Sequence, residues 1–273
     1  MHSFATTSPP LAHAPVTHAA TPTSAPHVAG QVTAPTLVHP DINPPIPCFV
    51  STPINVPALA QVLADHPDRA LVSFLINGFS VGFGLGVQGS VSQVITPNLR
   101  SALSNPDATS QAIYKEVARG HTHGPYLAPP FQPCHTSPIG IVAKNDGSFR
   151  LILDLSDNHA GSVNECIDIE EFSMSYCSFD DAVNLLLDIG PTPFMAKVDV
   201  KHAFRLCPVH PDEWPLLCFR WANAFFFDSR LPFGLRSSPF IFNSFADALH
   251  WAVVFHLHIL RIIHYLDDVF LCN

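Results

Sequence analysis

The sequence predicts an α+β fold, in which hairpins of β-strands are combined with separate helices. Apolar β-forming runs flank a turn signal within residues 139–155, and a second pair of such runs flanks two aspartates within residues 262–271. Between these hairpins, residues 178–190 open with a helix-capping pattern and continue with apolar residues at helical spacing. Strands joined by hairpins, with helices packed against them, are typical of the α+β class.

Residues 1–47 differ in composition from the rest of the chain. They are dominated by Pro, Thr, Ala, Ser and His, carry almost no charge and show no apolar period, so we expect a disordered leader. A solvated linker explains its histidines better than a metal site does, because none has the paired spacing of metal ligands. These histidines include His13, His18, His27 and His39.

Residues 48–130 are expected to form a helical adaptor that carries no chemistry. One helix should start near Asn55, ahead of a proline in its first turn, and a second should cover residues 106–119. The most apolar run, residues 70–87, contains four glycines and falls short of a membrane span. It predicts a buried or partner-facing helix and loop, and we expect no membrane association.

A capping box opens the helix that is expected over residues 178–190. Ser178 pairs in the pattern with Asp181, and Gly190 supplies the stop. Asp180 and Asp181 are therefore interpreted as helix-start charges and not as catalysts. The predicted buried stripe of this helix consists of Phe179, Val183, Leu186 and Leu187.

Charge and cysteine content limit the class of protein. The formal net charge is −9, with 13 Lys and Arg against 22 Asp and Glu, which argues against a chain that follows a phosphate backbone unaided. The seven cysteines include no C-x-x-C pair, so we expect free thiols in a reducing compartment. No secretory signal opens the sequence, and we expect an intracellular protein of the cytoplasm or nucleus.

Three aspartates are the strongest candidates for chemistry. Asp267 and Asp268 stand side by side at the expected tip of the second hairpin, where their side chains are free to meet cations. Asp199 lies on an apolar strand within residues 194–200, and alternation puts Lys197 on the same face. Taken alone, Asp199 could simply pair with that lysine. Carboxylates that converge from two strands can instead bind Mg²⁺, and two ions about 3.5–4 Å apart can clamp a phosphoryl displacement, which predicts a nucleotidyl transferase.

Three motifs resemble those of reverse transcriptases. Residues 265–268 (YLDD) resemble the catalytic box, residues 196–204 the strand that carries the first metal-binding aspartate, and residues 231–240 the loop and helix between them. In this order the three motifs are far more specific than any one of them. The LPFG form of the middle motif is similar to retrotransposons and retroviruses, and residues 161–264 look most like the DIRS group of tyrosine-recombinase retrotransposons. The resemblance implies the fingers and palm of a right-hand polymerase over residues 131–273.

The resemblance also implies the metal ligands. In the family, the aspartates that match Asp199 and Asp267 are the essential ligands of two Mg²⁺ ions, for which Mn²⁺ can substitute. The aspartate that matches Asp268 supports the site, and the backbone carbonyl that matches Val200 also ligates. Asp199, Asp267 and Asp268 are thus the implied catalytic residues.

Two basic residues of the hairpin within residues 139–155 are implied to hold the triphosphate of the incoming nucleotide. Lys144 and Arg150 match the basic positions of the family's fingers, where cations offset the charge of the leaving pyrophosphate. Family members often carry a second lysine beside the first, whereas this chain has Asn145. The alternative is that both side chains merely solvate an exposed hairpin.

Three more residues are implied to contact the nucleotide. Phe204 matches the aromatic gate that disfavours a ribose 2′-hydroxyl, so deoxynucleotides are expected; a core role is the alternative, since the chain has 21 phenylalanines. Phe233 is expected to pack beside the nucleotide, and Gly234 to let the backbone approach the nascent base pair. Arg236 could reach a phosphate or cap a surface.

The implied function is an RNA-directed DNA polymerase domain of a retroelement, which adds a deoxynucleoside triphosphate to a primer 3′-hydroxyl on an RNA or DNA template. Family members continue beyond the YLDD box into a thumb and a ribonuclease H portion, so we expect a truncated element whose partners include those portions or other element proteins. One alternative is an inactive remnant with a folded palm. A histidine-rich interaction or metal-binding protein with accidental acidic residues is a remote alternative.

Overall fold

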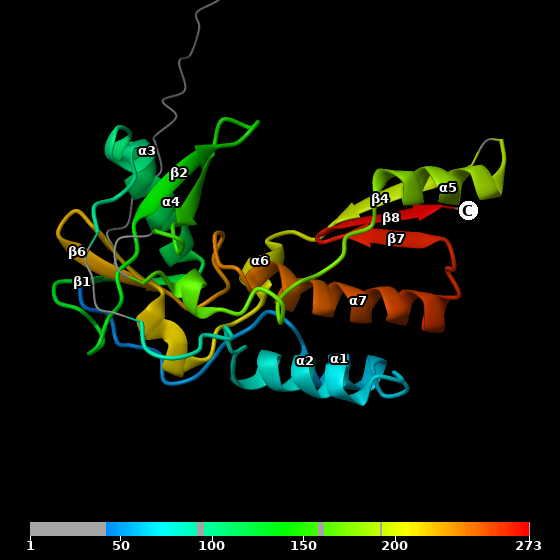
Figure 1. The fold of residues 1–273 in the computed structure, drawn as a ribbon, viewed down its shortest axis with the longest axis horizontal. Helices are drawn as coiled ribbons and strands as arrows, with labels where there is room; N and C mark the ends of the chain where they lie inside the picture. Colours follow the sequence, from blue (N-terminus) through cyan, green and yellow to red (C-terminus); the bar gives the residue numbers. More distant parts are fainter. Residues whose placement is uncertain (1–41, 92–95, 158–160, 192, 273) are drawn as a thin grey trace, which may run out of the picture. The chain divides into compact units, whose positions relative to one another are not determined.

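The computed structural model describes residues 42–91, 96–157, 161–191 and 193–272 (Figure 1). They belong to one compact unit, Pro40–Asn273. The helices are α1 (Val56–Val62), α2 (Arg69–Val81), α3 (Arg100–Leu103), α4 (Pro106–Ala118), α5 (Phe179–Ile189), α6 (Ala203–Leu206) and α7 (Ser238–Leu257), with two 3₁₀ turns at Val163–Cys166 and Pro211–Leu216. The strands are β1 (Thr122–Tyr126), β2 (Ile139–Ala143), β3 (Phe149–Leu153), β4 (Met195–Asp199), β5 (Cys218–Trp221), β6 (Ala224–Asp228), β7 (Ile262–Tyr265) and β8 (Asp268–Cys272).

The leader predicted over residues 1–47 lies almost wholly outside the described residues, as do His13, His18, His27 and His39. Its last residues are described. The backbone N–H of Asn43 donates to the carbonyl of Pro125 in β1 at 2.8 Å, and the Asn43 side chain accepts from the N–H of Leu127 at 2.9 Å. The chain is therefore held against β1 from Asn43, a few residues earlier than expected.

The described strands form three antiparallel sheets, in the orders β1-β6-β5, β2-β3 and β4-β8-β7. The predicted hairpin within residues 139–155 is confirmed as β2-β3, with Ala143 opposite Phe149. Its turn contains Gly147 at a φ of +77°, and the Asp146 carboxylate accepts from the Ser148 N–H at 2.9 Å. Asp and Gly are common in tight turns because the Asp carboxylate accepts a nearby backbone hydrogen bond and Gly tolerates a positive φ.

The second predicted hairpin is confirmed as β7-β8. Tyr265 faces Asp268 across it, so Leu266 and Asp267 form a two-residue turn in which Leu266 takes a φ of +52°. β8 also pairs with β4, and this pairing places Asp199 directly opposite Asp268. Figure 1 shows β8 between its two partners. The register therefore brings the upstream aspartate to the acidic hairpin.

Helix α7 starts at Ser238-Pro239 as predicted, and it contributes Ile241, Phe242 and Ala248 to the buried core. Among the described residues it is the one helix that is long and apolar enough to cross a membrane by length and composition. It packs against α2, α6 and β7, and this packing explains its apolar character as that of a core helix. Both predicted helices of residues 48–130 that carry a proline start are confirmed as α1 and α4, and the run 70–87 is confirmed as helix α2 and a loop.

The prediction of a buried stripe on α5 is wrong. Its capping box between Ser178 and Asp181 and its stop at Gly190 are present. Yet none of the residues Phe179–Ile189, all of which the structure describes, is buried, and Phe179 and Leu187 are 82% and 72% exposed. The residues just before the helix are held by a Tyr176–Tyr265 ring contact and by the Cys177 thiol, which donates to the His264 carbonyl. An apolar stripe shows which face of a helix would be buried, but burial also requires another surface that packs against that face.

All seven cysteines are described and are free thiols, as predicted. Cys134, Cys207, Cys218 and Cys272 are buried. Burial raises the pKa of the Cys207 thiol to about 12, because a thiolate is poorly solvated in an apolar interior. This thiol is therefore a packing residue and not a nucleophile.

Candidate active site

A pocket of about 620 Å³ lies where helix α4, the β2-β3 hairpin, the β4-α6 junction, the loop at Phe233 and the β7-β8 turn meet. Seven of the residues singled out from the sequence line it: Lys144, Arg150, Asp199, Val200, Phe204, Phe233 and Asp267. The other two, Gly234 and Asp268, each follow a lining residue in the chain. Segments that are remote in sequence are thus gathered at one cavity.

The β4-β8 register holds the carboxylates together. Asp199 ends β4, and the N–H of Val200 next to it donates to the carbonyl of Asp267 at 2.8 Å. Asp267 and Asp199 both line the pocket, with Asp199 exposed and Asp267 half-buried. The backbone therefore fixes how the β7-β8 turn meets the end of β4.

Lys197 provides the positive charge beside these carboxylates. Its ammonium donates to Asp268 at 2.9 Å, so the lysine expected as a partner of Asp199 pairs with Asp268. The hydrogen bond and charge of Asp268 raise the pKa of Lys197, and the negative charges of Asp199 and Asp267 raise it further. All three carboxylates therefore act on one ammonium.

The oxygen atoms of these residues suit a divalent cation whose coordination is completed by a bound substrate. Within the described ranges, no group of three or more His, Cys, Asp and Glu side chains is placed to hold a metal ion. Asp199 and Asp267 line one pocket, and the N–H of Val200, which follows Asp199 in the chain, donates to the carbonyl of Asp267. Mg²⁺ is commonly held by one or two carboxylates together with substrate phosphates, so these residues suit it. One oxygen of Asp268 is occupied by the Lys197 ammonium, which competes with any cation at this third carboxylate.

The lining of the pocket also includes basic and aromatic side chains. The Arg150 guanidinium lies 4.4 Å from the ring centroid of Phe233, at the range of a cation–π contact. Phe204 packs on Phe233 and on the buried Phe242, with centroids 5.3 and 5.9 Å apart. Phe204 is half-buried, so it is a core residue on one side and a pocket wall on the other.

Gly234 sits against the backbone of β3. Its φ is +106°, and a Cβ atom at this position would meet the Leu153 carbonyl oxygen at 2.3 Å. The N–H of Leu153 in turn donates to the Phe233 carbonyl at 3.3 Å. Glycine is therefore required by the fold here, because the Phe233 loop docks on the β2-β3 hairpin.

Arg236 acts as a cap. Its guanidinium donates to the backbone carbonyls of Asn164 and Ile167, and the Asn164 side chain accepts from its N–H at 2.8 Å. The sequence left open whether Arg236 reaches a phosphate or caps a surface, and these bonds support the capping role.

A buried ion network lies behind the pocket. Arg205 of α6, which is 5% exposed, donates to Asp228 of β6 at 2.7 Å and lies 3.4 Å from Glu116 of α4. Burial alone would raise the pKa of Glu116, but the hydrogen bond from His121, the charges of Arg205 and His121 and the bond from Arg119 lower it to about 2. The network ties helix α6, and with it Phe204, to two other elements.

Sequence reasoning missed the contribution of α4, which was expected to carry no chemistry. Ala112, Lys115 and Glu116 of this helix, and Arg119 after it, line the pocket. Their spacing of i, i+3, i+4 and i+7 marks one helix face. That spacing was visible in the sequence, but which face would meet the hairpin was not.

Basic side chains are concentrated at this cavity. Six of the 13 Lys and Arg of the chain line it, but only three of the 22 Asp and Glu do. The lining thus has a formal charge of +3 although the chain carries −9. The basic residues are Lys115, Arg119, Lys144, Arg150, Lys201 and Arg205.

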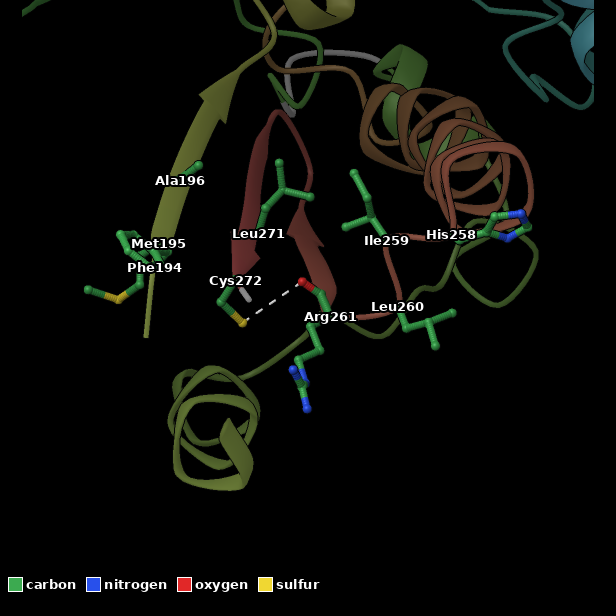
Figure 2. Close-up of a pocket in the computed structure, with 9 residues that line it drawn as sticks. All are labelled: Phe194, Met195, Ala196, His258, Ile259, Leu260, Arg261, Leu271 and Cys272. Atoms are coloured by element: carbon green, nitrogen blue, oxygen red, sulfur yellow. Dashed lines mark hydrogen bonds between the residues drawn. The ribbon is translucent and has the colours of Figure 1, made fainter. Parts of the chain in front are cut away.

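A second groove of about 590 Å³ runs between the start of β4 and the loop that joins α7 to β7 (Figure 2). Its lining is mainly apolar, with Phe194, Met195 and Leu260 prominent. In Figure 2 the one bond drawn joins the Cys272 thiol to the Arg261 carbonyl, at 3.9 Å. The groove contains none of the residues predicted for catalysis.

Solved structures of reverse transcriptases share this fold. The foamy viral protease-reverse transcriptase dRH in complex with double-stranded DNA matches with a TM-score of 0.53 and 16% identity, over 84% of this chain and 40% of that one. The same enzyme in complex with an RNA/DNA hybrid matches with a TM-score of 0.51 and 17% identity, over 84% of this chain and 31% of that one. The chain therefore has a reverse-transcriptase fold.

A curated sequence points to the same class. The retrovirus-related Pol polyprotein from transposon opus of Drosophila melanogaster is 22% identical over 247 residues, which is 81% of this chain and 23% of the polyprotein. The chain thus spans about a quarter of that relative's length. No family model matches the chain. The similarity to this retrovirus-related polyprotein agrees with the reverse-transcriptase fold.

Proposed function

We propose that the chain is an RNA-directed DNA polymerase domain of a retroelement, which transfers a deoxynucleotide to a primer 3′-hydroxyl. The observation that carries this proposal is one pocket that is lined by groups of opposite charge. Asp199 and Asp267 supply carboxylates to its lining, and Lys144 and Arg150 supply cations. A nucleoside triphosphate needs both, because its reacting phosphorus meets cations held by carboxylates while its outer phosphates meet basic side chains.

In the proposed reaction the primer 3′-oxygen forms a bond to the α-phosphorus, and the bond from that phosphorus to the bridging oxygen of the β-phosphate breaks. Pyrophosphate leaves with the electron pair, and the hydroxyl proton passes to solvent. Mg²⁺ held by Asp199, Asp267 and the Val200 carbonyl would lower the pKa of the hydroxyl and offset the charge of the leaving group. Lys144 and Arg150 would bind the β- and γ-phosphates and keep the pyrophosphate in line.

The sugar would lie against Phe204. This ring is held by Phe233 and Phe242, so it cannot easily move away from an added 2′-hydroxyl. Deoxynucleotides are therefore the proposed substrates. Arg150 and Phe233 form a stacked pair at 4.4 Å, which would cover the nucleotide from the hairpin side.

The proposed partners are a primer and an RNA or DNA template. Two structures with the same fold are described as complexes with double-stranded DNA and with an RNA/DNA hybrid. The positive lining of the pocket supports a polyanionic ligand in an otherwise acidic chain.

The test is primer extension on an RNA template with Mg²⁺ and deoxynucleotides, with Asp267→Asn as the matched inactive variant. We expect extension by the unaltered chain and a loss of about 10³-fold or more in the variant, since the carboxylate positions the cation that stabilises the transition state. Equal extension by both proteins would overturn the proposal. Binding of Mn²⁺ to both proteins gives a readout that does not depend on turnover.

A folded palm without catalysis is the second candidate. The bond between Lys197 and Asp268 favours it, because a lysine that occupies this carboxylate competes with a cation. Mn²⁺ binding without any primer extension would support this candidate.

A further inference from the structure

Lys115 is one of the pocket residues that the sequence motifs do not explain. It lies on the α4 face that lines the same cavity as Lys144 and Arg150 of the β2-β3 hairpin. Helix α4 packs directly on β3 and β2. Its lysine and those two residues therefore meet at one site although they come from different elements.

The charge of Lys115 acts on the turn of the β2-β3 hairpin. Hydrogen bonds from Ser148 lower the pKa of Asp146 in this turn, and the positive charges of Lys144 and Lys115 lower it further. Both ammonium groups therefore act on the same carboxylate. The hairpin itself offers few other cations, since Asn145 beside Lys144 is uncharged.

Lys115 is also free of competing partners. It is exposed, and no salt bridge within 4.0 Å joins it to another described residue. In contrast, Arg119 pairs with Glu116 at 2.9 Å and Arg205 pairs with Asp228 at 2.7 Å. Of these three basic residues in the pocket lining, Lys115 has its ammonium available for a ligand.

We propose that Lys115 is a phosphate-binding residue of the nucleotide site, which joins Lys144 and Arg150 to bind the triphosphate and the departing pyrophosphate. This rests on the proposed polymerase function. A triphosphate carries about four negative charges, which two side chains of a hairpin only partly offset, and a third cation on a packed helix adds attraction from a preorganised position.

The test measures binding of two probes, dATP with Mg²⁺ and inorganic tripolyphosphate, by titration calorimetry. We expect Lys115→Gln to weaken binding of both probes by about 3- to 10-fold, as Lys144→Gln should, because each removes one charge-assisted contact. Arg261→Gln, an exposed charge change in the other groove, should leave both affinities unchanged. Lys115→Gln combined with Asn145→Lys should regain most of the lost affinity.

The outcomes separate this inference from the polymerase proposal. Weaker binding in Lys144→Gln with no change in Lys115→Gln would overturn the role of Lys115 and leave the polymerase site intact. Tripolyphosphate binding that depends on Lys115 without any dATP binding would support the anion site and overturn the nucleotide site. Failure of the unaltered chain to bind either probe would overturn both.

Discussion

The ammonium of Lys197 lies 2.9 Å from a carboxylate oxygen of Asp268, on the neighbouring strand. The contact is diagonal, because Lys197 faces Phe270 in the β4-β8 register and Asp199 faces Asp268. Both side chains are partly exposed. The lysine thus occupies an oxygen of Asp268, the carboxylate next to the proposed cation ligands Asp199 and Asp267.

Replacement of this lysine should favour metal binding. We expect Lys197→Met to tighten binding of Mn²⁺ by about threefold, since removing a partly exposed ion pair frees a carboxylate at a modest electrostatic gain. Free Mn²⁺ can be measured by electron paramagnetic resonance, with Arg261→Met as the control for overall charge. Weaker binding in Lys197→Met would mean that Lys197 orients Asp268 for the metal.

Phe204 should decide between sugars. A smaller side chain in Phe204→Val leaves room for a 2′-hydroxyl, so the ratio of ATP to dATP affinity should rise by about tenfold. Phe225→Val, at a half-buried ring of β6 outside the pocket, is the matched control. An unchanged ratio would assign Phe204 to the core alone.

Alanine substitutions at two glycines should distinguish the cost of a positive φ from the cost of a steric clash. Gly147 and Gly234 both have a positive φ, but a Cβ at Gly147 meets nothing within 4 Å. Gly147→Ala should therefore lower the free energy of unfolding by about 1 kcal/mol, and Gly234→Ala by about 3 kcal/mol or more. Urea unfolding measures both, and equal losses would contradict the docking of the Phe233 loop on β3.

The buried ion network around Arg205 should contribute more to the free energy of unfolding than the more exposed pair of Arg119 and Glu116. Arg205→Met leaves Asp228, which is 1% exposed, without its cationic partner, and should cost about 3–5 kcal/mol of stability. Arg119→Met removes a more exposed partner of Glu116 and should cost less than about 1 kcal/mol. Thermal unfolding of the two variants distinguishes these values, and a smaller loss in Arg205→Met would show that water enters the network.

The folded state should lose stability in acid over a pH range that is set by His123. Burial, followed by the charge of Arg230, lowers the pKa of this histidine to about 4 from a usual value of 6.5. The folded chain therefore takes up the proton less readily than the unfolded chain, and stability that is present above pH 6.5 is lost as the pH falls toward 4.

His123→Phe, which keeps a ring against Phe227, should make this decline shallower. Chemical denaturation at a series of pH values tests the slope. Glu116, with a pKa of about 2, should lose its contribution only between about pH 4.5 and 2, so the two windows can be told apart. An equal slope in His123→Phe would assign the decline to other groups, among them His250, whose pKa is also lowered by burial.

Local patterns predicted the elements of this fold well. The β2-β3 turn, the Ser178 capping box and the Pro239 helix start each depend on neighbouring residues. Such signals can be interpreted from sequence because the hydrogen bonds that they describe close within a few residues. The three motifs added an order of segments that local patterns do not contain, and the DIRS-type subgroup stays a prediction.

Long-range contacts were predicted less well. Nothing in the sequence indicated that Lys115 would face the hairpin, that Arg205 would join Glu116 to Asp228, or that Lys197 would choose Asp268 over Asp199. Each depends on which surfaces pack together. The remote alternative of a protein with accidental acidic residues required Asp199 and Asp267 to lie apart, and they line one pocket.

The uneven distribution of charge should also govern how ligands arrive. Because the cavity is positive and the rest of the chain is acidic, the electric field should repel a polyanion from most directions and guide it toward one entrance. Such steering speeds association and fades as dissolved ions shorten the reach of the field to about 10 Å at 0.1 M ionic strength. Encounter rates should therefore fall steeply with salt, even for variants whose contacts within the site are intact.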